Sequence, residues 1–198
     1  MSDTIRQIQA RPGVYVGAAT QYASVGNVIL GLVEHSILRN HLNGNIKIVV
    51  TLSDSVIEVE DNGRTFPTVL DAEVGLSIAE LMLTTTRFNV PKDEIYCVQA
   101  AVALSSELNL VVENNGYRYK QDYNNGHPVA PFEYVTRLDT SNVGTKIRFK
   151  LSTEYFEGGW VVRALYKYLC DEITTLIGPF KDVIVEVRFS TSCVMKTG

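Results

Sequence analysis

The residues best suited to chemistry lie where a β-branched run gives way to a turn, at Asp61, Asn62, Gly63 and Arg64. An ionised carboxylate at such a place accepts hydrogen bonds worth roughly 1.5 to 3 kcal/mol. One such bond can distinguish between ligand groups but cannot by itself hold a large ligand tightly. An aspartate before Asn-Gly can also bond to the backbone two residues on. Asp61 is therefore either a recognition group or merely the cap of its own turn.

Residues that bind metals or phosphates elsewhere are not arranged for those tasks here. The cysteines at 97, 170 and 193 form no Cys-x-x-Cys pair, and the histidines at 35, 41 and 127 show no ligand spacing with them. No metal ion is therefore expected. No glycine occurs between Gly75 and Gly116. Because glycine-rich turns let backbone N–H groups cradle phosphate, a phosphate loop is not expected in this stretch.

A long helix and a hairpin must position the Asp61 turn. Apolar residues recur at three- and four-residue steps from Val25 to Ile37, which predicts a helix ending near residues 43–44. Residues 46–52 and 56–60 are β-branched and alternating, and residues 53–55 between them predict a hairpin turn.

The rest of the chain mixes both patterns. Helices are predicted at residues 77–83, 98–108 and 161–177, with a surface loop at 84–94. Strands are predicted at residues 108–113, 117–123, 132–138, 145–151 and 183–189, several of them separated by Asn-Gly turns. This order predicts an α+β fold with a mixed, mostly antiparallel sheet and helices on one face. Residues 1–189 are expected to form one domain and residues 190–198 a polar tail.

Composition narrows the function classes. The 198 residues carry a net charge of −4 without a basic stripe, so direct binding of nucleic acid is not expected. The apolar runs are too short to span a bilayer, and the N-terminus lacks the apolar region of a signal peptide. Separated cysteines suit reduced thiols. A cytoplasmic protein with no membrane partner is therefore expected.

Five segments accompany the long helix in a fixed order: RPGVYVG (11–17), VEDNGRTFP (59–67), EVGLSIAE (73–80), YNNGHPVAP (123–131) and GTKIRF (144–149). Together they resemble the N-terminal ATPase domain of DNA gyrase B and topoisomerase IV, in the GHKL group. Several spaced matches are far more specific than one short motif. The resemblance covers nearly the whole chain and implies the family fold, a two-layer α/β sandwich of the Bergerat type.

The resemblance implies an adenine-binding pocket around Asp61. This residue falls on the family aspartate that accepts a hydrogen bond from the adenine amino group. Thr145 matches a family threonine at the same adenine edge, although it can equally be an ordinary strand residue. Gly63, Phe66 and Pro67 would complete the pocket and its rim. The expected cofactor is therefore an adenine nucleotide, ATP or ADP, that binds weakly.

The catalytic positions of the family are not kept. Its water-activating glutamate and its Mg²⁺-binding asparagine fall on Gly31 and His35. Glycine cannot take a proton, and imidazole is a poor ligand for Mg²⁺. Glu34 lies about one helical turn away from the base position and is expected to be solvated or capping. No catalytic residue is therefore predicted, and ATP hydrolysis by the family mechanism is not expected.

Further departures concern charge and the phosphate side. The family pairs the arginine of the turn with a helix glutamate, but the matching residues are Arg64 and Arg39, which would repel each other. Either Arg64 points elsewhere or an anion lies between them. Thr65 replaces a family glycine and narrows the space for adenine. Residues 88–105 replace the family's lid and glycine-rich turn, and Ile95, Tyr96, Cys97 and Val98 stand where a triphosphate needs close backbone approach.

Three functions follow, in order of preference. The first is an inactive relative of the gyrase ATPase domain, a pseudo-ATPase that keeps part of an adenine pocket for a ligand-binding or regulatory role. The second is a protein-interaction module that acts on gyrase- or topoisomerase-type partners or associates with itself. The third, and the only enzyme among them, is an ATP-binding and ATP-hydrolysing fragment of a topoisomerase.

Overall fold

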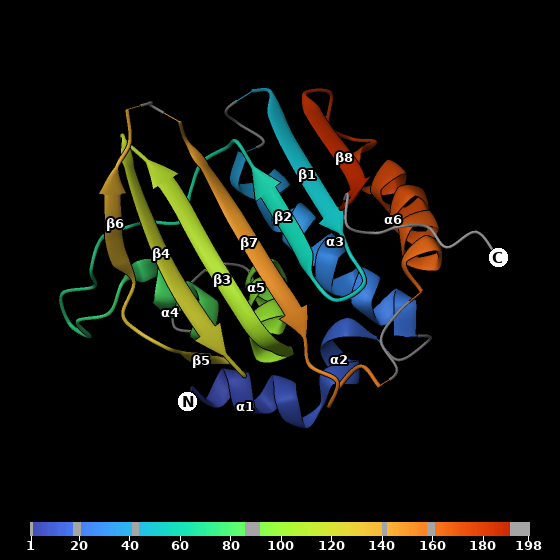
Figure 1. The fold of residues 1–198 in the computed structure, drawn as a ribbon, viewed down its shortest axis with the longest axis horizontal. Coiled ribbons are helices and arrows are strands. Elements are labelled where there is room, and N and C mark those ends of the chain that lie inside the picture. The colour runs from blue at the N-terminus through green and yellow to red at the C-terminus, as the bar shows by residue number, and fades with distance from the viewer. Residues whose placement is uncertain are drawn as a thin grey trace.

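The computed structural model describes residues 2–17, 21–40, 44–85, 92–139, 142–157 and 161–190, with the side chains of residues 21 and 92–97 left aside. In this part of the chain one sheet is backed by helices on a single face (Figure 1). The helices are α1 (Asp3–Ala10), α2 (Pro12–Val16), α3 (Gln21–Asn40), α4 (Ile78–Thr84), α5 (Lys92–Ala103) and α6 (Val162–Ile177). The strands are β1 (Ile46–Leu52), β2 (Ile57–Asp61), β3 (Ser105–Asn114), β4 (Tyr117–Asn124), β5 (His127–Pro128), β6 (Glu133–Arg137), β7 (Gly144–Leu151) and β8 (Val183–Phe189). Within the described residues, no helix is long and apolar enough to cross a membrane.

The strands run in the order β5-β4-β3-β7-β2-β1-β8, with β6 beside β4. Neighbouring strands are antiparallel except β1 and β8, which are parallel. Helix α3 lies behind β1 and β2, and it also contacts α5 and α6 (Figure 1). The expected α+β class, with a mixed and mostly antiparallel sheet and helices on one face, is confirmed.

Strand alternation decides which side chains face the helices. In β2, Ile57, Val59 and Asp61 are buried, whereas Glu58 and Glu60 lie on the other side. Because successive side chains of a strand point to opposite faces, the carboxylate of Asp61 continues the buried row of β2 toward α3. Thr145 is the residue of β7 that pairs with Asp61, and it is buried as well.

Two predicted turns have the backbone that their residues favour. Asn115 and Gly116 have φ angles of 54° and 77°, and Asn125 and Gly126 have 47° and 81°. Two consecutive residues at positive φ form the tight hairpin turn for which Asn-Gly is the preferred pair. Both predicted turns, and the predicted hairpin of β1 and β2, are confirmed.

The largest error of the sequence-based assignment lies between α5 and β3. The helix predicted for residues 98–108 ends at Ala103, and the chain turns into a strand at Ser105. Strand β3 pairs with both β4 and β7, and this pairing outweighs local helix preference. Helix α5 begins at Lys92, so the loop predicted for residues 84–94 is shorter, and residues 86–91 lie outside the described part. Three short elements, α1, α2 and β5, were not predicted.

Candidate functional site

The candidate site forms where the last turns of α3 cross the end of β2. Asp61 is the last residue of β2, and its side chain is 3% exposed. The residues of α3 that reach it are Ser36 and Arg39, while Asn40 holds the turn that follows. Ser36, Arg39 and Asn40 are three and four positions apart, so they share one face of the helix.

The Asp61 carboxylate accepts three hydrogen bonds from the protein itself. Its Oδ2 accepts from the Ser36 hydroxyl at 2.8 Å and from Arg39 Nη2 at 2.8 Å. Its Oδ1 accepts from the backbone N–H of Gly63 at 3.0 Å. The hydrogen bond from Gly63 therefore supports the interpretation of Asp61 as the cap of its own turn. The carboxylate is also half of a buried ion pair.

Arg39 places its guanidinium in the middle of the predicted adenine pocket. Its Nη1 donates to the carbonyl of Arg64 at 2.7 Å and lies 3.4 Å from the hydroxyl oxygen of Thr145. Its central carbon lies 4.7 Å from the centre of the Phe66 ring. Burial lowers the pKa of the Arg39 guanidinium, and the nearby charge of Asp61 opposes that shift. Arg64 has an exposed side chain and accepts from Arg39 through its backbone carbonyl, while its charge still contributes to the lowered pKa of Arg39.

The face of α3 toward the site carries no carboxylate. His35 stacks on Phe66 with ring centres 5.3 Å apart, and both rings are buried. Gly31 is buried one turn earlier on the same face, and Arg39 follows one turn later. Glu34 is exposed, as expected for a solvated side chain.

Asn40 ties the turn after β2 to α3. Its side-chain oxygen accepts from the backbone N–H of Arg64, and its amide nitrogen donates to the carbonyl of Ser36 at 2.7 Å. A Cβ atom on Gly63 would overlap that Asn40 oxygen, so the turn needs glycine there. Sequence reasoning did not identify Ser36 or Asn40 and did not name Asp61 as the partner of Arg39. The available signal was polar residues at helical spacing on an otherwise apolar helix.

The structure brings most of the predicted pocket residues together. Asp61, Gly63, Phe66 and Thr145 all contact Arg39 or the turn that it holds. Pro67 is exposed beside Phe66. The side chains of Ile95, Tyr96 and Cys97, predicted to obstruct the phosphate side, lie outside the described part, whereas Val98 is buried in the core.

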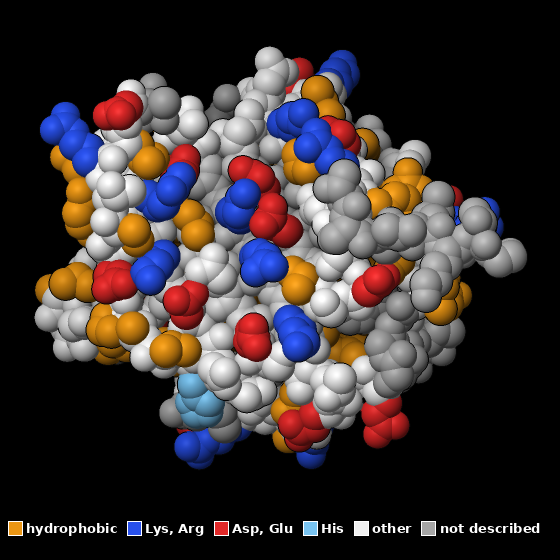
Figure 2. Space-filling view, viewed as in Figure 1, with side chains coloured by type: hydrophobic (Ala, Val, Ile, Leu, Met, Phe, Trp, Pro, Cys, Tyr) orange, Lys and Arg blue, Asp and Glu red, His pale blue; other side chains and the backbone are white. Residues whose placement is uncertain are grey.

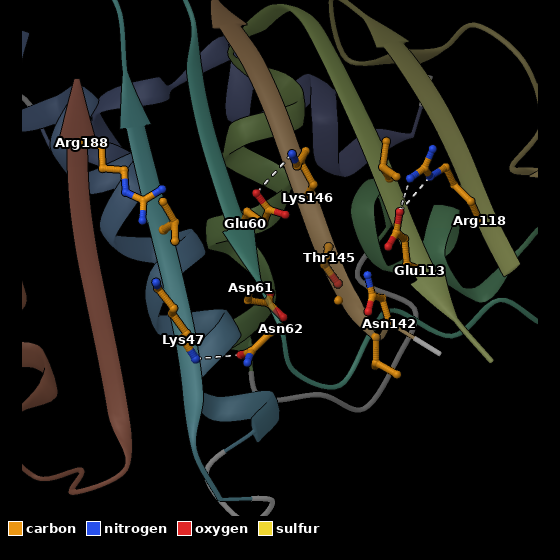
Figure 3. A pocket seen from close by; sticks show the side chains of 14 residues that line it. Lys47, Glu60, Asp61, Asn62, Glu113, Arg118, Asn142, Thr145, Lys146 and Arg188 are labelled. Atoms are coloured by element: carbon orange, nitrogen blue, oxygen red, sulfur yellow. Dashed lines mark hydrogen bonds and ion pairs between the residues drawn. The ribbon is translucent and has the colours of Figure 1, made fainter. Parts of the chain in front are cut away.

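The open face of the sheet carries a charged hollow of about 760 Å³, and its lining includes Asp61 and Thr145 of the candidate site. Figure 2 shows charged side chains of both signs across the middle of this face, and Figure 3 shows those that line the hollow. Lys146 pairs with Glu60 at 3.2 Å, Lys47 pairs with Glu186 at 3.3 Å, and Arg118 pairs with Glu113. Cations and carboxylates on neighbouring strands neutralise one another, which is typical of the solvated face of an antiparallel sheet.

Comparison with known proteins identifies the family of this chain. The chain is 30% identical over 164 residues to DNA gyrase B of Borrelia hermsii, a match that covers 77% of this chain and 25% of that protein. It is 28% identical over 197 residues to DNA gyrase B of Rickettsia felis, covering 93% of this chain and 24% of that protein. Its fold matches the 43K ATPase domain of Thermus thermophilus gyrase B, solved in complex with an aminocoumarin, with a TM-score of 0.75 at 20% identity over 92% of this chain and 48% of the other. The chain is a gyrase B-like GHKL domain.

This gyrase B-like domain spans about a quarter of the length of the gyrase B relatives, since the matches cover 24% to 25% of those proteins. The structural likeness shows the fold. No protein-family model matches the chain.

The described residues of the gyrase B-like domain do not fit a magnesium nucleotide. A hard cation needs oxygen ligands, but Gly31, His35 and the cationic Arg39 offer none. The oxygens of Ser36 and Asn40 are engaged with Asp61 and with the N–H of Arg64. The described part of the chain contains no group of three or more His, Cys, Asp or Glu side chains that could hold a metal ion. Asp61, the acceptor implied for adenine, is bound to Arg39 and Ser36.

Proposed function

We propose that residues 1–189 form a pseudo-ATPase: a gyrase B-like domain that does not hydrolyse ATP, binds adenine nucleotides weakly and has a ligand-binding or regulatory role in the cytoplasm. One observation carries this proposal. The face of α3 that packs against Phe66 and Asp61 presents Gly31, His35 and Arg39, so these positions supply no carboxylate to activate water and no oxygen ligand for Mg²⁺.

Other described carboxylates do not replace the missing base. Glu34 is exposed on the outer side of α3. Glu60 lies on the open face of the sheet, 3.2 Å from Lys146. Asp61 is ion-paired with Arg39 and accepts two further hydrogen bonds, whereas a general base must face the water that it activates.

The test is phosphate release with ATP and Mg²⁺, measured beside an active gyrase B ATPase domain. We expect no release above the buffer background. We also expect none from Gly31→Glu combined with His35→Asn, because this variant still has Arg39 on Asp61 and lacks the phosphate-binding turn. Release by the wild-type protein that a pocket substitution such as Asp61→Asn abolishes would contradict the proposal. Release by the double variant alone would show that the phosphate side is competent.

A second candidate function, binding to a gyrase- or topoisomerase-type protein or to a second copy, is favoured by the loop between β2 and α4. Val69 and Leu70 are 59% and 67% exposed, and Val74 and Leu76 also remain in contact with solvent. Neighbouring exposed apolar side chains are typical of interaction surfaces. The loop is ordered by hydrogen bonds from the N–H groups of Glu73 and Val74 to Asp71, both 3.0 Å long, so it would lose little entropy on binding.

We expect Leu70→Asp to weaken binding to purified gyrase proteins, or self-association, by about tenfold or more, because it places a charge in an apolar contact. The measurement is light scattering coupled to size-exclusion chromatography, with and without the gyrase proteins. Ile184→Asp, at an exposed apolar residue of β8, is the matched control. A protein that stays monomeric and binds no gyrase protein would reject this second function and leave the pseudo-ATPase proposal intact.

A further inference from the structure

We infer that Arg39 is an internal occupant of the adenine subsite and determines which ligands that subsite accepts. The inference rests on the proposed function, because it concerns the same subsite. The domain discriminates against 6-aminopurines because the guanidinium of Arg39 already contacts Asp61 and Thr145, the side chains that would bind the purine edge.

The side chains that would hydrogen-bond to adenine are already in contact with Arg39. Arg39 Nη2 lies 2.8 Å from Asp61 Oδ2, the same oxygen that accepts from Ser36. Arg39 Nη1 lies 3.4 Å from the Thr145 hydroxyl oxygen. Asp61 and Thr145 are the two side chains implied for the adenine edge, and they face each other across β2 and β7. An adenine amino group would need the acceptor that Arg39 holds.

The Phe66 ring, which would be the flat apolar surface of the subsite, is also covered by Arg39. The guanidinium lies over the Phe66 ring, 4.7 Å from its centre, and His35 stacks on the same ring. A planar cation over an aromatic ring is an attractive contact, so Arg39 is held by the ring as well as by the ion pair. A purine and this guanidinium cannot occupy the same contacts. Binding of adenine therefore requires Arg39 to leave.

Arg39 is not fully satisfied in its buried position. Among the described residues, Arg39 Nε is buried without an acceptor, and an unsatisfied buried donor lowers the stability of the state that contains it. When Arg39 leaves, Asp61 keeps its bonds from Ser36 and from the N–H of Gly63. The apparent affinity for adenine is then reduced by the small fraction of molecules with an open subsite.

The experiment measures ADP binding without metal by isothermal titration calorimetry. We expect Arg39→Ala to raise the affinity for ADP by roughly 10- to 100-fold over the wild type, because the open fraction approaches one. Arg39→Gln keeps a shorter, uncharged donor for Asp61; it should fold even if Arg39→Ala does not, and give a smaller gain. Arg148→Ala removes an exposed arginine from the opposite face of β7, the strand that carries Thr145, and should change nothing.

Adding Asp61→Asn to Arg39→Ala tests whether the increase in ADP affinity arises at this subsite. This second change should remove the gain, since the amide no longer offers a charged acceptor to the adenine amino group. Equal ADP affinity in the wild type and in both folded Arg39 variants would overturn the inference, whether that affinity is high or absent. This result is distinct from failure of the proposed function, which phosphate release by the wild-type protein would show.

Discussion

Asp61→Asn is expected to lower the free energy of unfolding by about 3 kcal/mol, because it leaves the guanidinium of Arg39 buried without its counter-charge. Removing one partner of a buried ion pair is more harmful than removing both, since the remaining ion loses water and partner together. Arg39 is 13% exposed, so some hydration remains and the effect should lie at the lower end of the range for buried pairs. Urea unfolding followed by circular dichroism measures it.

The matched control for this charge is Glu60→Gln. Glu60 precedes Asp61 in β2, but it lies on the open face, where its side chain is 49% exposed and pairs with Lys146. Its loss should cost less than about 1 kcal/mol, as for other exposed pairs. Combining Asp61→Asn with Arg39→Met should give a variant more stable than the sum of the single effects predicts. Additive effects would mean that the two side chains do not depend on each other.

Phe66→Ala is expected to lower the free energy of unfolding by about 3 to 5 kcal/mol, the usual range for truncating a fully buried aromatic side chain. Phe66 is 1% exposed and supports both the His35 ring and the Arg39 guanidinium. The substitution removes a large apolar surface and leaves a cavity between α3 and the chain that follows β2. Thermal and urea unfolding of the same samples measure the loss.

Phe132→Ala provides the comparison, because Phe132 is partly exposed and stacks on Tyr119 at 5.6 Å near the β6 edge of the sheet. Its truncation should be clearly less harmful, since surrounding water can fill the space. A loss of stability at Phe66 no greater than that at Phe132 would contradict the role given to Phe66 in the packing of the site.

Local residue preferences made much of the fold predictable. The Asn-Gly pairs at residues 115–116 and 125–126 form hairpin turns because asparagine and glycine tolerate positive φ. The alternation in residues 46–52 and the helical spacing between Val25 and Ile37 each identify one buried face. The end of α5 was not predictable in this way, because the pairing of Ser105–Asn114 with two strands from later in the chain decides where the helix stops.

The sequence by itself determined the family resemblance, the elements around the Asp61 turn and the absence of a glutamate at Gly31, because these depend on residue type and on spacing along the chain. Only the tertiary structure decided which partner each charge has. Arg39 and Asp61 are 22 positions apart, and packing of α3 across β2 brings them to 2.8 Å while Arg64 points to solvent. The two like charges coexist because a buried carboxylate binds Arg39 and water solvates the exposed Arg64.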